Sequence, residues 1–244
     1  MILEVLILNN WRERLAVMNS DLTGRTMLVL ELVAFIAGLI YLKKYRDTPL
    51  FWFILFLGYN FINEISAGVY YVLTDAYSTY VFYNTRSLIF ISLMYGMYYK
   101  MLSIKVLRQF TALFYVVWLV SYIQFIATSN FYRELCLFSN TLGDFLLIVI
   151  IVFSLIESIK LSKIVDFGDN FIVYLGVGWL IYLVISLPGN IIVLVGWMRN
   201  LKAEGDLVQF FQLIRSLTFA VAGLMYVIFA YGFYRAKSPQ LIND

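Results

Sequence analysis

Residues 50–73 read LFWFILFLGYNFINEISAGVYYVL, and this stretch decides the fold class. It is long and apolar enough to cross a bilayer as a helix, because about 20 predominantly apolar residues span the hydrocarbon core. Asn60, Asn63 and Glu64 nevertheless lie well inside the run. At 3.6 residues per turn, Asn60 and Glu64 share one face of the helix and Asn63 lies beside them. A carboxylate at the centre of a spanning helix costs roughly 2.5–3.5 kcal/mol, so we expect this face to point into a helix bundle or a wet cavity.

The composition of the whole chain indicates a membrane protein. The 244 residues are 62% hydrophobic and 14% charged, whereas a soluble domain is about 45–50% apolar and about 25% charged. The 19 Tyr, 21 Phe and 5 Trp residues fit aromatic belts at the two membrane interfaces. A net charge of +3 without a dense basic run argues against nucleic acid as a partner.

The sequence lacks the residues of several common active sites. It contains no histidine, which excludes histidine metal sites, histidine general bases and Ser-His-Asp or Cys-His pairs. The single cysteine, Cys136, cannot form an internal disulfide. Glu31, Glu64 or Asp144 could act as an acid or base, but no nucleophile or metal-ligand set accompanies them. We therefore predict a protein that is not an enzyme and that uses no cofactor or metal.

Seven apolar runs predict an all-α bundle of seven transmembrane helices within one domain, residues 26–235. The runs are 26–42, 50–73, 83–101, 110–127, 135–156, 171–195 and 208–233. Each is long enough to cross a bilayer, and the short connections leave no room for a soluble domain. Residues 1–25 begin with an apolar stretch too short to span, which predicts an N-terminal interfacial segment. Residues 236–244 are expected to form a short cytoplasmic tail.

Lysine and arginine residues in the short loops predict the orientation, because the more positive side faces the cytoplasm. One side carries ten: Lys43, Lys44, Arg46, Lys100, Lys105, Arg108, Lys160, Lys163, Arg235 and Lys237. The other side carries six: Arg12, Arg14, Arg25, Arg133, Arg199 and Lys202. We therefore expect the N-terminus outside and the C-terminus in the cytoplasm.

With this topology, the polar residues inside the runs gather in the outer halves of the helices, above inner halves that are apolar and aromatic. The candidate ligand-binding residues are Glu31, Asn60, Asn63, Glu64, Arg86, Asn140, Asp144, Asn190, Gln212 and Arg215. Asn190 follows Pro188, which interrupts helical hydrogen bonding and produces either an opening beside a site or a simple packing kink. The pattern predicts a polar pocket that opens to the outside and is closed by packed side chains on the inner side.

The charges in this predicted pocket are close to balance. Glu31, Glu64 and Asp144 stand against Arg86 and Arg215. This set fits ion pairs that join helices, such as Glu64–Arg215 or Asp144–Arg86, as well as it fits a site for a zwitterion. Arg86 lies near the start of its run, and this position favours snorkelling to the interface over an interior role.

Three stretches carry a resemblance to a known group of proteins. They are FYNTRSLIF (82–90), NTLGDFLLIVI (140–150) and NFIVYLGVGWLIYL (170–183). They resemble uncharacterised bacterial seven-helix integral membrane proteins over the second to seventh helices. The resemblance supports the helix count only and implies no function. We expect the chain to lie in the bacterial inner membrane.

The polar outer half and apolar inner half favour a sensor- or receptor-like protein that binds a small polar or amphipathic ligand from the outer side. So little cytoplasmic chain would require a cytoplasmic or membrane signalling partner. A small-solute transporter or permease is one alternative, and it needs a path through the inner half. A structural or assembly subunit of a membrane complex is the other, with buried polar groups that pair only with one another.

Overall fold

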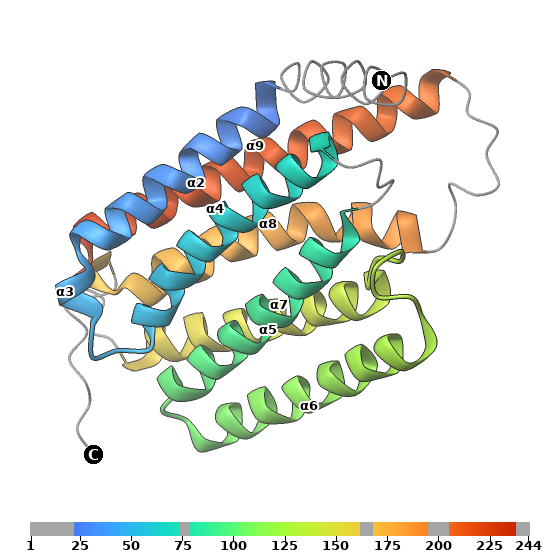
Figure 1. The fold of residues 1–244 in the computed structure, drawn as a ribbon. Helices are drawn as coiled ribbons and strands as arrows, with labels where there is room; N and C mark the ends of the chain where they lie inside the picture. Colours follow the sequence, from blue (N-terminus) through green and yellow to red (C-terminus); the bar gives the residue numbers. More distant parts are fainter. Residues whose placement is uncertain (1–21, 74–78, 162–167, 195–204, 238–244) are drawn as a thin grey trace.

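The structure is a computed structural model that describes residues 22–73, 79–161, 168–194 and 205–237, and these residues are all-helical (Figure 1). The long helices are α2 (Leu22–Ile40), α4 (Leu50–Leu73), α5 (Tyr80–Met101), α6 (Lys105–Thr128), α7 (Leu137–Leu161), α8 (Phe171–Leu194) and α9 (Gly205–Arg235). A short helix, α3 (Leu42–Tyr45), follows α2. The predicted apolar runs are thus confirmed as helices, and most of the helices extend a few residues beyond them. The predicted N-terminal segment lies outside the described residues except for its last residues, which belong to α2.

Six of these helices, α2, α4, α6, α7, α8 and α9, are long and apolar enough to cross a membrane. The chain is therefore a multi-pass membrane protein by the length and composition of its helices. Six of the seven predicted spans are thus confirmed as helices that could cross a membrane. Helix α5 has 22 residues but is the least apolar of the long helices, and it carries Arg86 and Lys100.

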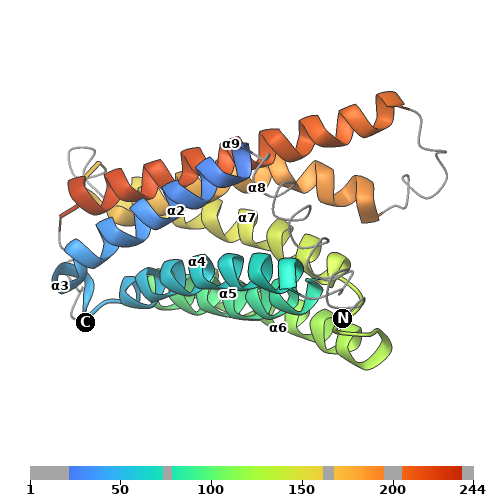
Figure 2. The same cartoon turned by 45° about the horizontal axis from the view of Figure 1, so that its top comes forward.

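Successive helices run antiparallel and form a closed ring. Each long helix packs on the next, α2 packs on both α4 and α9, and α5 also touches α7. Figure 2 shows α4, α5 and α6 on one side of the molecule and α2 and α9 on the other. We call the end that holds α3 the α3 end, and the opposite end, where α5 begins, the Asn84 end.

Aromatic side chains fill the bundle at the α3 end. They are Tyr45, Phe53, Phe171, Phe229 and Phe233, and none is more than 1% exposed. Phe171 stacks on Phe233 with ring centroids 4.4 Å apart, and Tyr45 contacts both rings at 5.5 and 5.7 Å. Each such pair adds about 0.5–1.5 kcal/mol beyond the burial of its area. We call these five residues the aromatic plug, and they confirm the predicted packing in that half.

A group of ion pairs joins α8 and α9 at the α3 end, outside the plug. The Lys237 ammonium lies 2.5 Å from Asp169 Oδ2, and the Arg235 guanidinium lies 3.7 Å from Oδ1. The backbone N–H of Lys237 also donates to the Asp169 carbonyl at 2.7 Å. The hydrogen bond from Lys237 and its positive charge lower the pKa of Asp169 below the usual carboxyl range. These contacts join the end of α9 to the start of α8.

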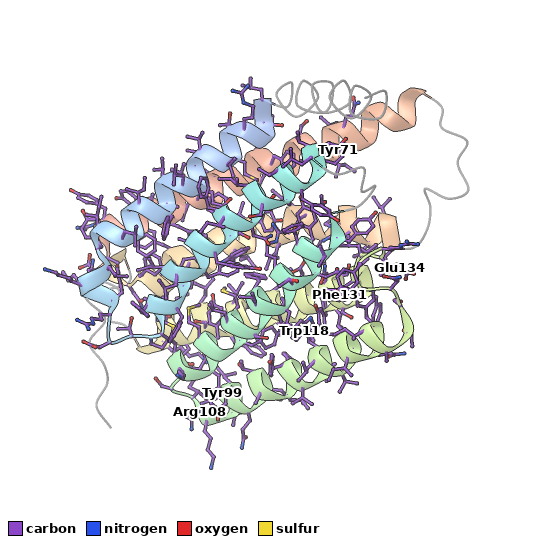
Figure 3. All side chains as sticks on the ribbon, viewed as in Figure 1. Tyr71, Tyr99, Arg108, Trp118, Phe131 and Glu134 are labelled. Atoms are coloured by element: carbon purple, nitrogen blue, oxygen red, sulfur yellow. The ribbon has the colours of Figure 1, made fainter. Side chains whose placement is uncertain are left out.

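Asn84 holds α5 in place at its start. Its side-chain amide donates to the carbonyls of Phe131 and Glu134 at 2.8 and 2.9 Å and accepts the N–H of Cys136 at 2.9 Å. The Tyr122 hydroxyl donates to the Asn84 carbonyl at 2.9 Å. Figure 3 shows Phe131 and Glu134 in the connection between α6 and α7 at this end. One side chain therefore fixes α5 against both neighbours.

A buried acid holds the opposite end of α5 and the start of α6. Glu157 of α7 is 4% exposed, and its Oε1 accepts the N–H groups of Ser103 and Ile104 at 2.6 and 3.2 Å. An anion at a helix start satisfies donors that have no partner within the helix and complements the helix dipole. Arg108 lies over the ring of Tyr99 at 5.6 Å at this end (Figure 3). Both ends of α5 are thus tied to α6 and α7, which sets the depth of Arg86.

Candidate functional site

Glu31 lies at the middle of α2 and is fully buried. The side-chain amide of Asn60 on α4 donates to Glu31 Oε1, and it also lies 3.2 Å from the hydroxyl oxygen of Tyr226 on α9. The second carboxyl oxygen, Oε2, is buried and has no hydrogen-bond partner among the described residues. Because α2 begins at Leu22 rather than at residue 26, Glu31 lies deeper than the predicted outer-half position.

An ion pair lies one turn further along α4. Glu64 Oε1 binds the guanidinium of Arg86 on α5, and the two side chains are 18% and 31% exposed. The guanidinium also lies 5.1 Å from the ring centre of Tyr83, a cation–π distance. Arg86 therefore turns into the bundle instead of snorkelling, and its partner is Glu64 rather than the predicted Asp144.

Helices α7 and α8 complete the polar region. Asp144 on α7 is half-buried and lies within electrostatic range of Arg86. Tyr182 on α8 lies within electrostatic range of both residues. The Ser87 hydroxyl donates to Asn140 at 2.5 Å, which joins α5 to α7 one turn from Asp144. We call Glu31, Asn60, Glu64, Arg86, Asp144, Tyr182 and Tyr226 the polar cluster, and it draws on six helices.

The remaining predicted site residues lie around this cluster or away from it. Asn63 is buried beside it, where its amide donates to the Phe82 carbonyl at 3.4 Å. Asn190 is half-buried near the end of α8, whereas Gln212 and Arg215 are exposed. The Arg215 guanidinium lies over the ring of Phe219 at 5.2 Å.

Arg215 lies nearer the Asn84 end than the residue of α9 at the level of Glu31, within electrostatic range of Tyr83, whose ring faces Arg86. Tyr226 is the residue of α9 at the level of Glu31, and Arg215 lies roughly 16 Å closer to the Asn84 end at 1.5 Å per residue. Arg215 is exposed, which differs from the predicted interior position.

Because Arg215 is not part of the polar cluster, the charges in the cluster differ from the predicted near balance. Among the described residues, the polar cluster holds the carboxyl groups of Glu31, Glu64 and Asp144 and a single guanidinium, that of Arg86. The ion pair engages one carboxyl group and leaves two. No group of three or more potential metal ligands forms in the described part of the chain. The cluster can therefore accept a positive charge or hydrogen-bond donors.

Sequence reasoning missed Tyr182, Tyr226 and Glu157. The two tyrosines stand in apolar runs among 19 tyrosines in all, and no local pattern separates them from residues of an interfacial belt. Glu157 follows the predicted end of its run, so it was expected in a loop, yet α7 continues to Leu161. A polar residue in the last turns of a long helix is the signal that could have identified it.

Comparisons with family models, with curated proteins and with solved structures give no match for this chain. We therefore infer its function from its own residues.

Proposed function

We propose that the chain is a seven-span inner-membrane protein whose polar cluster binds a small polar or amphipathic ligand from the outer side, in a sensor- or receptor-like role. The Lys and Arg bias supports an orientation with the α3 end in the cytoplasm, since Lys44, Lys100 and Arg108 all lie there. Helix α5 counts as the seventh span in this proposal. It packs on α4, α6 and α7, and the side chains of Asn84 and Arg86 find partners inside the bundle.

The observation that carries the proposal is the unpaired oxygen of Glu31 in a cluster with surplus acid. A buried acceptor without a donor costs about 1–3 kcal/mol, and acidic residues at membrane depth almost always pair with something. An ammonium group would donate the hydrogen bond that Glu31 Oε2 lacks, so we expect a ligand that is cationic or zwitterionic.

The aromatic plug favours a sensor over a transporter. It closes the bundle between the polar cluster and the α3 end with five buried rings. A ligand that reaches the cluster from the Asn84 end therefore meets a closed path beyond it. A transporter needs the plug to open in each cycle, whereas a sensor needs only a change in how the helices pack around the bound ligand.

Binding by purified protein in detergent micelles tests the site. Tetramethylammonium, ethanolamine and glycine are suitable probes, and each should raise the melting temperature as its concentration exceeds the dissociation constant. E31Q and D144N should abolish the increase for the effective probe. E134Q, which changes an exposed acid at the Asn84 end, should keep it. Wild-type increases in both cluster variants would reject the site.

Transport and assembly are tested separately. Uptake of the effective probe by protein reconstituted in liposomes would replace the sensor with a permease. Co-purification of a stable membrane partner, unaffected by the probe and by E31Q, would favour an assembly subunit.

A further inference from the structure

A groove lies on the surface between α4 and α5, apart from the polar cluster. Its volume is about 410 Å³, and its lining includes Trp52, Ile89, Leu93, Gly96, Met97 and Lys100. Apart from Lys100 and one serine hydroxyl, the lining is apolar. The groove begins at the α3 end, where α4 starts and α5 ends, and it runs toward the middle of the bundle.

One side of the groove is open. A Cβ atom added at Gly96 would meet no heavy atom within 4 Å. The side chain of Trp52 is 59% exposed beside it, whereas Met97 is 3% exposed and belongs to the base. In a multi-pass membrane protein, an open apolar groove at this depth faces acyl chains.

The length of the groove matches one leaflet. Ile89 and Lys100 are separated by roughly 16 Å along α5 at 1.5 Å per residue. The hydrocarbon core is about 30 Å thick, so this length is about half of it. The groove thus extends from headgroup level to the middle of the bilayer, which is the depth of one acyl chain.

The groove carries a positive charge where it meets the α3 end. Lys100 is exposed, and within the described part of the chain no carboxylate lies within ion-pair distance of it. Lys43, Lys105 and Arg108 are exposed at the same end of the bundle. A basic end attracts anionic headgroups, by about 1 kcal/mol for each lysine or arginine near the surface.

We propose that this groove binds one anionic phospholipid, with an acyl chain along Trp52, Gly96 and Ile89 and its phosphate at Lys100. A zwitterionic phospholipid would fit the apolar part equally well, so Lys100 supplies the preference. The site does not depend on the polar cluster or on its ligand.

Trp52 provides a reporter for the test. Wild-type protein and W52F are reconstituted into vesicles that contain phosphatidylglycerol or phosphatidylcholine with brominated acyl chains, which quench nearby tryptophan. The Trp52 signal is the difference between the two proteins. We expect a relative affinity about fivefold higher for phosphatidylglycerol, which corresponds to about 1 kcal/mol for one lysine.

Two variants and one control decide the result. K100Q should abolish the preference, so that phosphatidylglycerol and phosphatidylcholine quench Trp52 equally. G96F should reduce quenching by both lipids because its ring fills the groove. K105Q changes an exposed lysine at the same end that does not line the groove, and it should keep the preference. Equal quenching by the two lipids in wild type, or an unchanged preference in K100Q, would overturn the proposal.

Discussion

Removing the charge of Arg86 should destabilise the protein more than removing the charge of its partner, Glu64. The two residues form one ion pair. If the pair were isolated, neutralising either partner would lower the free energy of unfolding by a similar amount. The surroundings of the pair are not symmetric. Arg86 also lies in the field of Asp144 and Glu31, so E64Q leaves the guanidinium beside other acids. R86Q leaves three carboxyl groups without a positive charge.

The size of the difference follows from the burial of the pair. Removing one partner of a buried ion pair costs about 3–5 kcal/mol. Arg86 keeps 31% of its side chain exposed, so we expect R86Q to cost about 3 kcal/mol, at the low end of that range. The amide oxygen introduced by E64Q would still accept a hydrogen bond from Arg86, so the cost of that substitution should stay near about 1 kcal/mol. A difference of about 2 kcal/mol is roughly thirtyfold in the unfolding equilibrium constant.

Titration of purified protein in mixed micelles with a denaturing detergent measures this difference, with tryptophan fluorescence as the signal. D144N in the R86Q background should recover about 1 kcal/mol, because it removes one uncompensated carboxylate. R133Q, which changes an exposed arginine at the Asn84 end, should change stability by less than about 0.5 kcal/mol. Equal losses in R86Q and E64Q, or a further loss on adding D144N, would refute the idea that Arg86 serves several acids.

Three further outcomes follow from the contacts at the ends and in the core. E157A should cost about 1–3 kcal/mol in the same titration, because two backbone N–H groups at the start of α6 lose their acceptor; E157Q, which keeps an acceptor oxygen, should cost less. G143A should cost about 1–3 kcal/mol, because its Cβ would lie 2.8 Å from an indole carbon of α6. G96A, which faces open space, should be neutral or stabilising. An equal loss of stability in G143A and G96A would contradict this packing. The lowered pKa of Asp169 means that its contribution to stability is present above the ordinary carboxyl pKa and is lost as the pH falls below about 4. K237Q should make the acid-induced loss smaller, and an unchanged pH profile of unfolding would exclude this interaction.

The helices were predictable from the sequence because apolar length determines what can cross a bilayer. The partners of the polar residues were not. Glu31 and Tyr226 share Asn60 as a hydrogen-bond partner only because the ring closes between α2 and α9, and no local pattern encodes that closure. Arg86 is a further example, since a residue near a helix start can snorkel or turn inward. The rotation of α5 between its neighbours decides between the two, and that rotation is set by packing far from Arg86 along the chain.

The candidate roles differ in what neutralises Glu31, and this difference separates them physically. In an assembly subunit the buried polar groups would pair only with one another, yet Glu31 Oε2 has no hydrogen-bond partner among the described residues. In a transporter the neutralising group would have to leave toward the α3 end, past Phe171 and Phe233 stacked at 4.4 Å. In a sensor the group enters and leaves by the Asn84 end, and the plug stays closed. The plug contacts therefore separate a transporter, which must break them, from a sensor, which can leave them intact.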